Sequence, residues 1–297
     1  MPAALAIDST TTTAATTVVQ RARPMLGTLV SVRIDAAGID PEPALDAAFA
    51  DVDAVHRALS FHDVDSELHR LNRDAHRQAV AVGPDTWRVL GASLALARAS
   101  AGCFDPTIAG RLVQDGFLPA HDGHVWAADA NWRDVQRLPG RRVRFARPLL
   151  LDFGGIAKGY AVDRAVRALQ RAGVRAGLVN AGGDLRAFGD HIEDIAVRHP
   201  GDPQRTLPLL RLRDGAVATS AGYFSEDPTY TPLIDPIRDA HCGRHGSVSV
   251  SAPRAIWADA LTKIVLVDED IAASLLPRLG ATAMHLDDTG RARRIGA

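Results

Sequence analysis

The sequence predicts an α+β fold for this chain of 297 residues. Segments with the apolar spacing of helices are separated along the chain, and several consecutive strands are expected between them. Strands that follow one another in this way favour α+β over a doubly wound sheet, in which strands and helices alternate. A hydrophobic content of 46% is typical of a globular protein, and the chain is long enough to bury a sizeable core.

The first half of the chain carries clear periodic signals. Alternating apolar and polar residues in TLVSVRI are typical of a half-buried strand, whereas Leu45, Phe49 and Val52 share one face of an amphipathic helix. Ser66 is a residue type that caps helix N-termini. The predicted elements are a strand over 28–34, helices over 41–59, 66–71 and 85–100, and loops with short strands over 115–147.

The second half predicts strands between two apolar helices. The first of these helices ends near Gly173, and the turn AGGD follows the next strand. The predicted elements are a helix over 156–172, strands over 177–180, 195–198, 207–212, 216–219 and 247–251, helices over 255–267 and 271–279, and a strand over 283–286.

Charge and composition argue against several classes of protein. The formal net charge of −1 gives no basic excess for a nucleic-acid surface, and we expect no nucleic-acid partner. No run of about 18 apolar residues exists, so we expect no membrane span. Two cysteines, Cys103 and Cys242, are too few for a disulfide framework and fit a reducing compartment.

The N-terminal stretch is rich in Ala and Thr. It has no Lys or Arg before Arg21 and lacks an apolar core of signal-peptide length. We therefore expect a disordered tail over residues 1–20, an ordered chain from near Arg23, and a cytoplasmic rather than a periplasmic location.

A glycine-rich turn with a lysine follows a buried strand in LDFGGIAKGYAVDRAV, residues 151–166. Lys158 falls in the first helical turn, where a cation opposes the helix dipole at a cost of about 0.3–1 kcal/mol. An anion bound there would offset this cost, because glycine backbone N–H groups and a helix N-terminus both attract phosphate. The alternative is an ordinary strand-to-helix turn with a solvated lysine.

Asp259 and Lys263 stand four residues apart in an otherwise apolar helix. The acid-first order is the favourable one for a helical ion pair. A carboxylate in such surroundings needs a partner, either a cation or a metal ion.

Five stretches taken together resemble the FAD:protein FMN transferase (ApbE-like) family. They are PMLGT (24–28), GCFDPTI (102–108), DFGGIAKGY (152–160), NAGGDLRAFG (180–189) and ADALTK (258–263). The resemblance runs from about Arg21 to Leu286 and implies one domain over 21–297, with mixed and antiparallel sheets and packed helices.

The resemblance also implies an activity. Members bind FAD, cleave its pyrophosphate, transfer FMN to a threonine or serine hydroxyl of an acceptor protein and release AMP. Two alternatives stay open at this point: a homologue that binds FAD without transferring FMN, as a flavin carrier or assembly factor, and an FAD pyrophosphatase.

Site residues follow from the same resemblance. Lys158 and Asp259 align with the family's catalytic positions, and a Mg²⁺ ion is expected on Asp259 and the Gly155 carbonyl, which are hard oxygen ligands. The residues expected to contact FAD are Leu26, His62, Cys103, Phe104, Asp105, Asp152, Lys158 and Pro232.

Five positions depart from the family pattern, among them Asp239, which replaces a glycine. Pro232 replaces a histidine and cannot accept a proton, and Lys263 replaces a metal-site threonine. Either Lys263 pairs with Asp259 in place of the metal, or the neighbouring Thr262 ligates Mg²⁺ and Lys263 points elsewhere. The first is slightly favoured, because residues 262 and 263 differ by about 100° around a helix. Leu26 and His62 replace a methionine and an aromatic residue, respectively.

Overall fold

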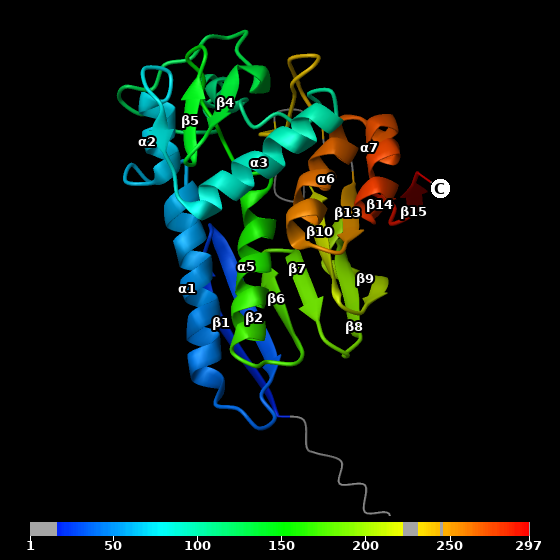
Figure 1. The fold of residues 1–297 in the computed structure, drawn as a ribbon. Coiled ribbons are helices and arrows are strands. Elements are labelled where there is room, and N and C mark those ends of the chain that lie inside the picture. Colours follow the sequence, from blue (N-terminus) through cyan, green and yellow to red (C-terminus); the bar gives the residue numbers. More distant parts are fainter. Residues whose placement is uncertain (1–16, 222–230, 244–245, 297) are drawn as a thin grey trace, which may run out of the picture.

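An eight-stranded sheet forms the centre of the computed structural model, which describes residues 17–221, 231–243 and 246–296 (Figure 1). Every neighbouring pair of strands in it is antiparallel. In sheet order, the strands are β1 (Val18–Met25), β2 (Thr28–Asp35), β6 (Gly177–Ala181), β7 (Asp184–Phe188), β10 (Gly215–Ala221), β13 (Ser247–Ala252), β14 (Thr282–Leu286) and β15 (Ala292–Ile295).

Smaller sheets lie around this centre. A three-stranded sheet lies beside α2, and a separate hairpin of two strands lies next to β7 and β10 (Figure 1). The three-stranded sheet contains, in order, β3 (Val80–Ala81), β5 (Arg142–Phe145) and β4 (Val135–Leu138). The hairpin consists of β8 (Glu193–His199) and β9 (Asp202–Leu212), and a further two-stranded sheet pairs β11 (Ile234–Asp235) with β12 (Ala240–His241).

Helices cover one face of the central sheet. The helices are α1 (Pro41–Leu59), α2 (Glu67–Asp74), α3 (Pro84–Ala99), α4 (Ala109–Gln114), α5 (Ala157–Arg171), α6 (Ala255–Val267) and α7 (Glu269–Leu275), with short 3₁₀ turns at Trp132–Asp134 and Pro277–Leu279. α5 packs between α1 and α6 and also contacts β6 and β7 (Figure 1). None of the helices in the described ranges is long and apolar enough to cross a membrane.

The packing of α5 explains why its sequence is so apolar on one side. Val162, Val166 and Leu169 are fully buried between the sheet and the flanking helices. Complete burial of a side chain of this size contributes about 1.5–3 kcal/mol. The helix that carries Lys158 is therefore fixed from three sides.

Most predicted elements are confirmed. The helix over 41–59 has these bounds, Ser66 caps α2 by accepting a hydrogen bond from the His69 amide at 2.9 Å, and the AGGD turn joins β6 to β7. The sequence does not predict β1, β3, β7, β11, β12, β15 or α4.

The expected start of the ordered chain is wrong. Residues 1–16 of the predicted tail lie outside the described residues, but β1 begins at Val18 and pairs along its whole length with β2, from Val18 opposite Asp35 to Met25 opposite Thr28. Main-chain pairing with β2 orders these residues, although most of their side chains are exposed and show no apolar alternation.

Candidate active site

A cavity of about 270 Å³ opens where three segments meet: the loop after α3, the turn before α5 and the segment around β11. Its walls include six of the residues predicted from the sequence, which are Cys103, Phe104, Asp105, Asp152, Gly155 and Pro232. Lys263 also lines it, together with apolar side chains such as Ile108 and Phe117.

Hydrogen bonds to the residues just before the two glycines fix the position of the glycine-rich turn. The side chain of Asn72, fully buried, accepts from the Leu151 amide at 2.8 Å and donates to the Leu151 carbonyl at 3.0 Å. The next amide, that of Asp152, donates to the Pro106 carbonyl at 2.8 Å and so joins the turn to the loop after α3. The Asp152 carboxylate accepts from the Gly154 amide at 3.0 Å, and burial raises its pKa.

The loop after α3 contributes one wall through Cys103, Phe104 and Asp105. Burial raises the pKa of the Cys103 thiol to about 12, so the sulfur stays protonated at neutral pH. Burial also raises the pKa of Asp105, against hydrogen bonds from the Thr107 amide at 2.8 Å and hydroxyl at 2.7 Å. These bonds indicate that the Asp105 carboxylate shapes the loop.

Two lysines and two aspartates form a cluster of four charges, which reaches this cavity through Lys263. Lys158 lies in the first turn of α5, as predicted, and its Nζ pairs with Asp184 of β7 and lies 4.0 Å from Asp259 Oδ1. Lys263 Nζ donates to the same Oδ1 and, at 3.1 Å, to the Asp259 carbonyl. Asp259 is fully buried, and the Gly159 amide donates to its Oδ2 at 3.0 Å.

The two aspartates of this four-charge cluster titrate in opposite directions. Burial acts to raise the pKa of Asp259, but the charges of Lys158 and Lys263 outweigh it and hold that pKa below its usual range. Burial and the neighbouring Asp259 charge raise the pKa of Asp184, with Lys158 opposing them. Of the two carboxylates, Asp259 is therefore the more acidic.

The donor groups around Asp259 do not fit a divalent cation. The Thr262 hydroxyl, expected as a ligand, donates to the Asp259 carbonyl at 2.7 Å and lies 2.8 Å from the Ser220 hydroxyl. Of the two arrangements expected from the sequence, the structure has the pairing of Lys263 with Asp259. Among the described residues, no group of three His, Cys, Asp or Glu side chains is placed to hold a metal ion.

The family follows from comparison with known proteins. A model described as the ApbE family matches residues 26–284. This chain belongs to the ApbE family.

Relatives and solved structures agree with this assignment. The chain is 30% identical over 282 residues to an FAD:protein FMN transferase of Treponema pallidum (strain Nichols), covering 83% of this chain and 78% of the relative. It is also similar to the crystal structure of the flavinyl transferase ApbE of Pseudomonas stutzeri in its apo form, with 25% identity, a TM-score of 0.79, and coverage of 95% and 98% of the two chains. The ApbE protein of Thermotoga maritima gives 28% identity, a TM-score of 0.79, and coverage of 94% and 97%. The predicted α+β fold is thereby confirmed.

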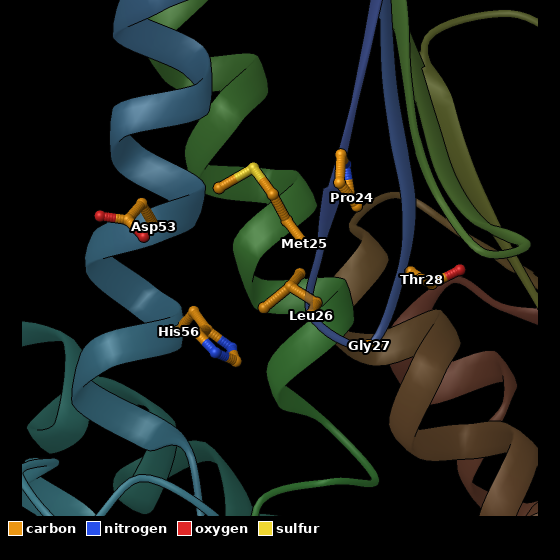
Figure 2. Close-up of a pocket in the computed structure, with 7 residues that line it drawn as sticks. All are labelled: Pro24, Met25, Leu26, Gly27, Thr28, Asp53 and His56. Carbon is orange, nitrogen blue, oxygen red and sulfur yellow. The ribbon is translucent and has the colours of Figure 1, made fainter.

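Leu26 lies apart from the other predicted contacts of this ApbE-family chain. It lines a separate cavity of about 520 Å³, between the β1–β2 turn and the Asp53 and His56 side of α1 (Figure 2). Leu26 and Gly27 form the two-residue turn, with φ of 56° and 68°. A leucine in the left-handed region is strained, and such strain is often retained at functional sites.

His62 does not line either of these two cavities. Its side chain is exposed, and His62 is the weakest of the influences that act to lower the pKa of Asp152 against its burial. The FAD contacts predicted for Leu26 and His62 stay predictions.

Two acidic residues that hold the site of this ApbE-family chain were not predicted from the sequence. Asp184 belongs to the AGGD turn, where the sequence signal indicated only a turn. Asp163 of α5 is 3% exposed and accepts from the first two amides of α6, those of Ala255 at 3.1 Å and Ile256 at 3.2 Å. It also pairs with Arg186 at 2.7 Å, and it fixes the helix that carries Asp259 and Lys263.

Proposed function

We propose that this chain is an FAD:protein FMN transferase. It takes FAD as substrate, transfers the FMN part to a threonine or serine hydroxyl of an acceptor protein and releases AMP. The observation that carries the proposal is the cavity at the glycine-rich turn, which the four-charge cluster reaches through Lys263, in a chain of the ApbE family. The relatives' names support the same reaction.

The proposed reaction exchanges one P–O bond for another. The acceptor hydroxyl oxygen bonds to the phosphorus of the FMN part, and the bond from that phosphorus to the bridging oxygen breaks. AMP leaves with the bridging oxygen and its electron pair, and the hydroxyl proton passes to solvent. The departing phosphate gains negative charge, so fixed positive charge near the diphosphate lowers the barrier.

The residues that line the cavity have different roles in the proposed reaction. Apolar side chains such as Phe104, Ile108 and Phe117 suit the aromatic part of the nucleotide, while Lys263 faces the cavity as a positive charge. The N-terminus of α5 begins at Ala157, directly after the glycine-rich turn, and adds the positive end of the helix dipole. Pro232 lines the same cavity and cannot take the proton of the acceptor.

The proposed reaction also requires an acceptor protein, in the compartment where this chain acts. The acceptor must present an accessible threonine or serine at the mouth of the cavity. The cytoplasmic location stays a prediction.

The test uses purified full-length chain, FAD and an acceptor domain with one target threonine. We expect one AMP for each acceptor whose mass increases by FMN less water. An acceptor in which that threonine is replaced by valine is the matched control and should gain no mass. AMP without acceptor modification would indicate a pyrophosphatase, and bound FAD without AMP would indicate a non-transferring flavin-binding protein; either result would overturn the proposal.

A further inference from the structure

We infer that the Lys263 ammonium occupies the place of a divalent cation at Asp259, and that this chain neutralises the FAD diphosphate with its two lysines and no bound divalent ion. The inference rests on the proposed function and specifies how the same site supplies positive charge. It concerns Lys263 as a substrate-binding residue, a role that the ApbE-family match does not give it.

The lysine composition of the chain is the first observation. The sequence has 34 lysines and arginines together, and only Lys158 and Lys263 among them are lysines. Both lie in the four-charge cluster: Lys263 Nζ pairs with Asp259 Oδ1, and Lys158 Nζ pairs with Asp184 and lies 4.0 Å from the same Oδ1. Every other basic position is served by arginine. The cluster therefore uses the compact point charge of an ammonium, which a planar guanidinium does not replace.

The path of the Lys263 side chain is the second observation. Its Cγ and Cε lie 3.6 Å from where a Cβ on Gly155 would be, so its stem runs along the glycine-rich turn. Its side chain is 18% exposed and forms part of the wall of the 270 Å³ cavity. The ammonium thus lies between the Gly155 turn and Asp259, the two positions expected to hold Mg²⁺.

The use of the oxygen atoms is the third observation. Each oxygen of Asp259 already accepts a hydrogen bond. Lys263 donates to Oδ1, the Gly159 amide donates to Oδ2 at 3.0 Å, and the Thr262 hydroxyl donates to the carbonyl oxygen at 2.7 Å. A divalent cation would have to displace Lys263 from a carboxylate that is fully buried. The displaced ammonium would lose its ion pair with this buried carboxylate.

The charge of the cluster is the fourth observation. The formal charges of the two paired aspartates and the two lysines sum to zero, so the cluster carries no excess charge that a cation would have to neutralise. A divalent ion added beside both ammonium groups would meet like charge at close range. The incoming diphosphate brings negative charge instead, and it meets Lys263 at the cavity wall.

The primary test measures metal and FAD binding separately from turnover. Because the chain has two lysines, protein labelled with ¹³C and ¹⁵N in lysine should give two side-chain Cε signals, assigned with Lys263→Arg. We expect FAD in EDTA to shift the Lys263 signal, and millimolar Mg²⁺ without FAD to leave both signals in place. Titration with Mn²⁺, followed by electron paramagnetic resonance, should show no stoichiometric binding to the unaltered chain.

Variants test the role of the ammonium. Lys263→Met keeps the length of the side chain without its charge, and we expect at least a tenfold loss of FAD affinity in EDTA. Lys263→Thr supplies a hydroxyl, and Mg²⁺ should restore part of its FAD affinity. Arg211→Met is the matched control, because it removes one positive charge from an exposed side chain that does not line the cavity. Its FAD affinity should stay within twofold.

Two results would overturn the inference. One is stoichiometric Mn²⁺ binding by the unaltered chain together with a tenfold loss of FAD affinity in EDTA. The other is an FAD affinity of Lys263→Met equal to that of Arg211→Met. Both readouts stand even if no acceptor is modified, so failure of the inference and failure of the proposed transferase reaction are distinguishable.

Discussion

Replacement of Asp163 by alanine should loosen the helix that carries the candidate active site. The carboxylate accepts from the Ala255 and Ile256 amides at 3.1 and 3.2 Å, and α6 has no capping side chain of its own at Arg254. Loss of such a cap costs about 1 kcal/mol, up to about 2. The change also leaves Arg186 without its partner at 2.7 Å.

The magnitude follows from the burial of this ion pair. Asp163 and Arg186 are 2% and 19% exposed at their side chains, and removing one partner of a buried pair costs about 3–5 kcal/mol. Since Arg186 keeps some solvent contact and the two effects overlap, we expect a total loss of about 3–4 kcal/mol for Asp163→Ala. Asp163→Asn keeps an oxygen acceptor but loses the charge, and should cost about half as much.

Urea unfolding followed by far-ultraviolet circular dichroism measures this difference. The FAD affinity of Asp163→Ala should also fall under conditions where the variant remains folded, because Lys263 sits on the same helix. A loss of less than 1 kcal/mol for Asp163→Ala, or equal effects of alanine and asparagine, would refute the assignment of Asp163 as the cap of α6.

Three further predictions concern other parts of the molecule. Gly159→Ala should destabilise the fold by about 2–4 kcal/mol in the same urea assay, because its Cβ would lie 2.2 Å from the Ala255 carbonyl oxygen; a neutral result would show that α5 and α6 separate freely. Burial lowers the pKa of His124 to about 4, so the unfolded chain binds more protons below about pH 6.5. This contribution is present above about pH 6.5 and is lost as the pH falls toward 4, by about 1–2 kcal/mol after allowance for partial exposure, and His124→Gln should remove that part of the pH dependence. Cys103, whose pKa is raised to about 12 by burial, should react with iodoacetamide at pH 8 at least tenfold more slowly than Cys242, as measured by peptide mass spectrometry; equal rates would contradict its burial.

The parts of the site that the sequence predicts are those that depend on local spacing. Asp259 and Lys263 share a helix at positions four apart, and Lys158 follows two glycines at a strand-to-helix junction, so both arrangements can be inferred from neighbouring residues. Asp184 and Asp163 act across 26 and 92 residues of sequence, on Lys158 and on the Ala255 amide. Their roles depend on how β7, α5 and α6 pack, which no local pattern encodes.

In the fold, too, elements with a local side-chain pattern were predicted and elements defined by long-range pairing were not. The helix over 41–59 was predicted with its bounds because its buried face repeats with helical period. β1 was missed because it is an edge strand whose residues are mostly exposed, so that main-chain pairing with β2, and not a side-chain pattern, defines it.

The most direct measurement is acceptor flavinylation by the unaltered chain in EDTA, with AMP and acceptor mass followed together. We predict that AMP and modified acceptor form in equal amounts in EDTA, at a rate within twofold of that in Mg²⁺. Modification that requires Mg²⁺ would contradict the role of Lys263 in place of the cation. No AMP and no modified acceptor in either condition would contradict the transferase function itself.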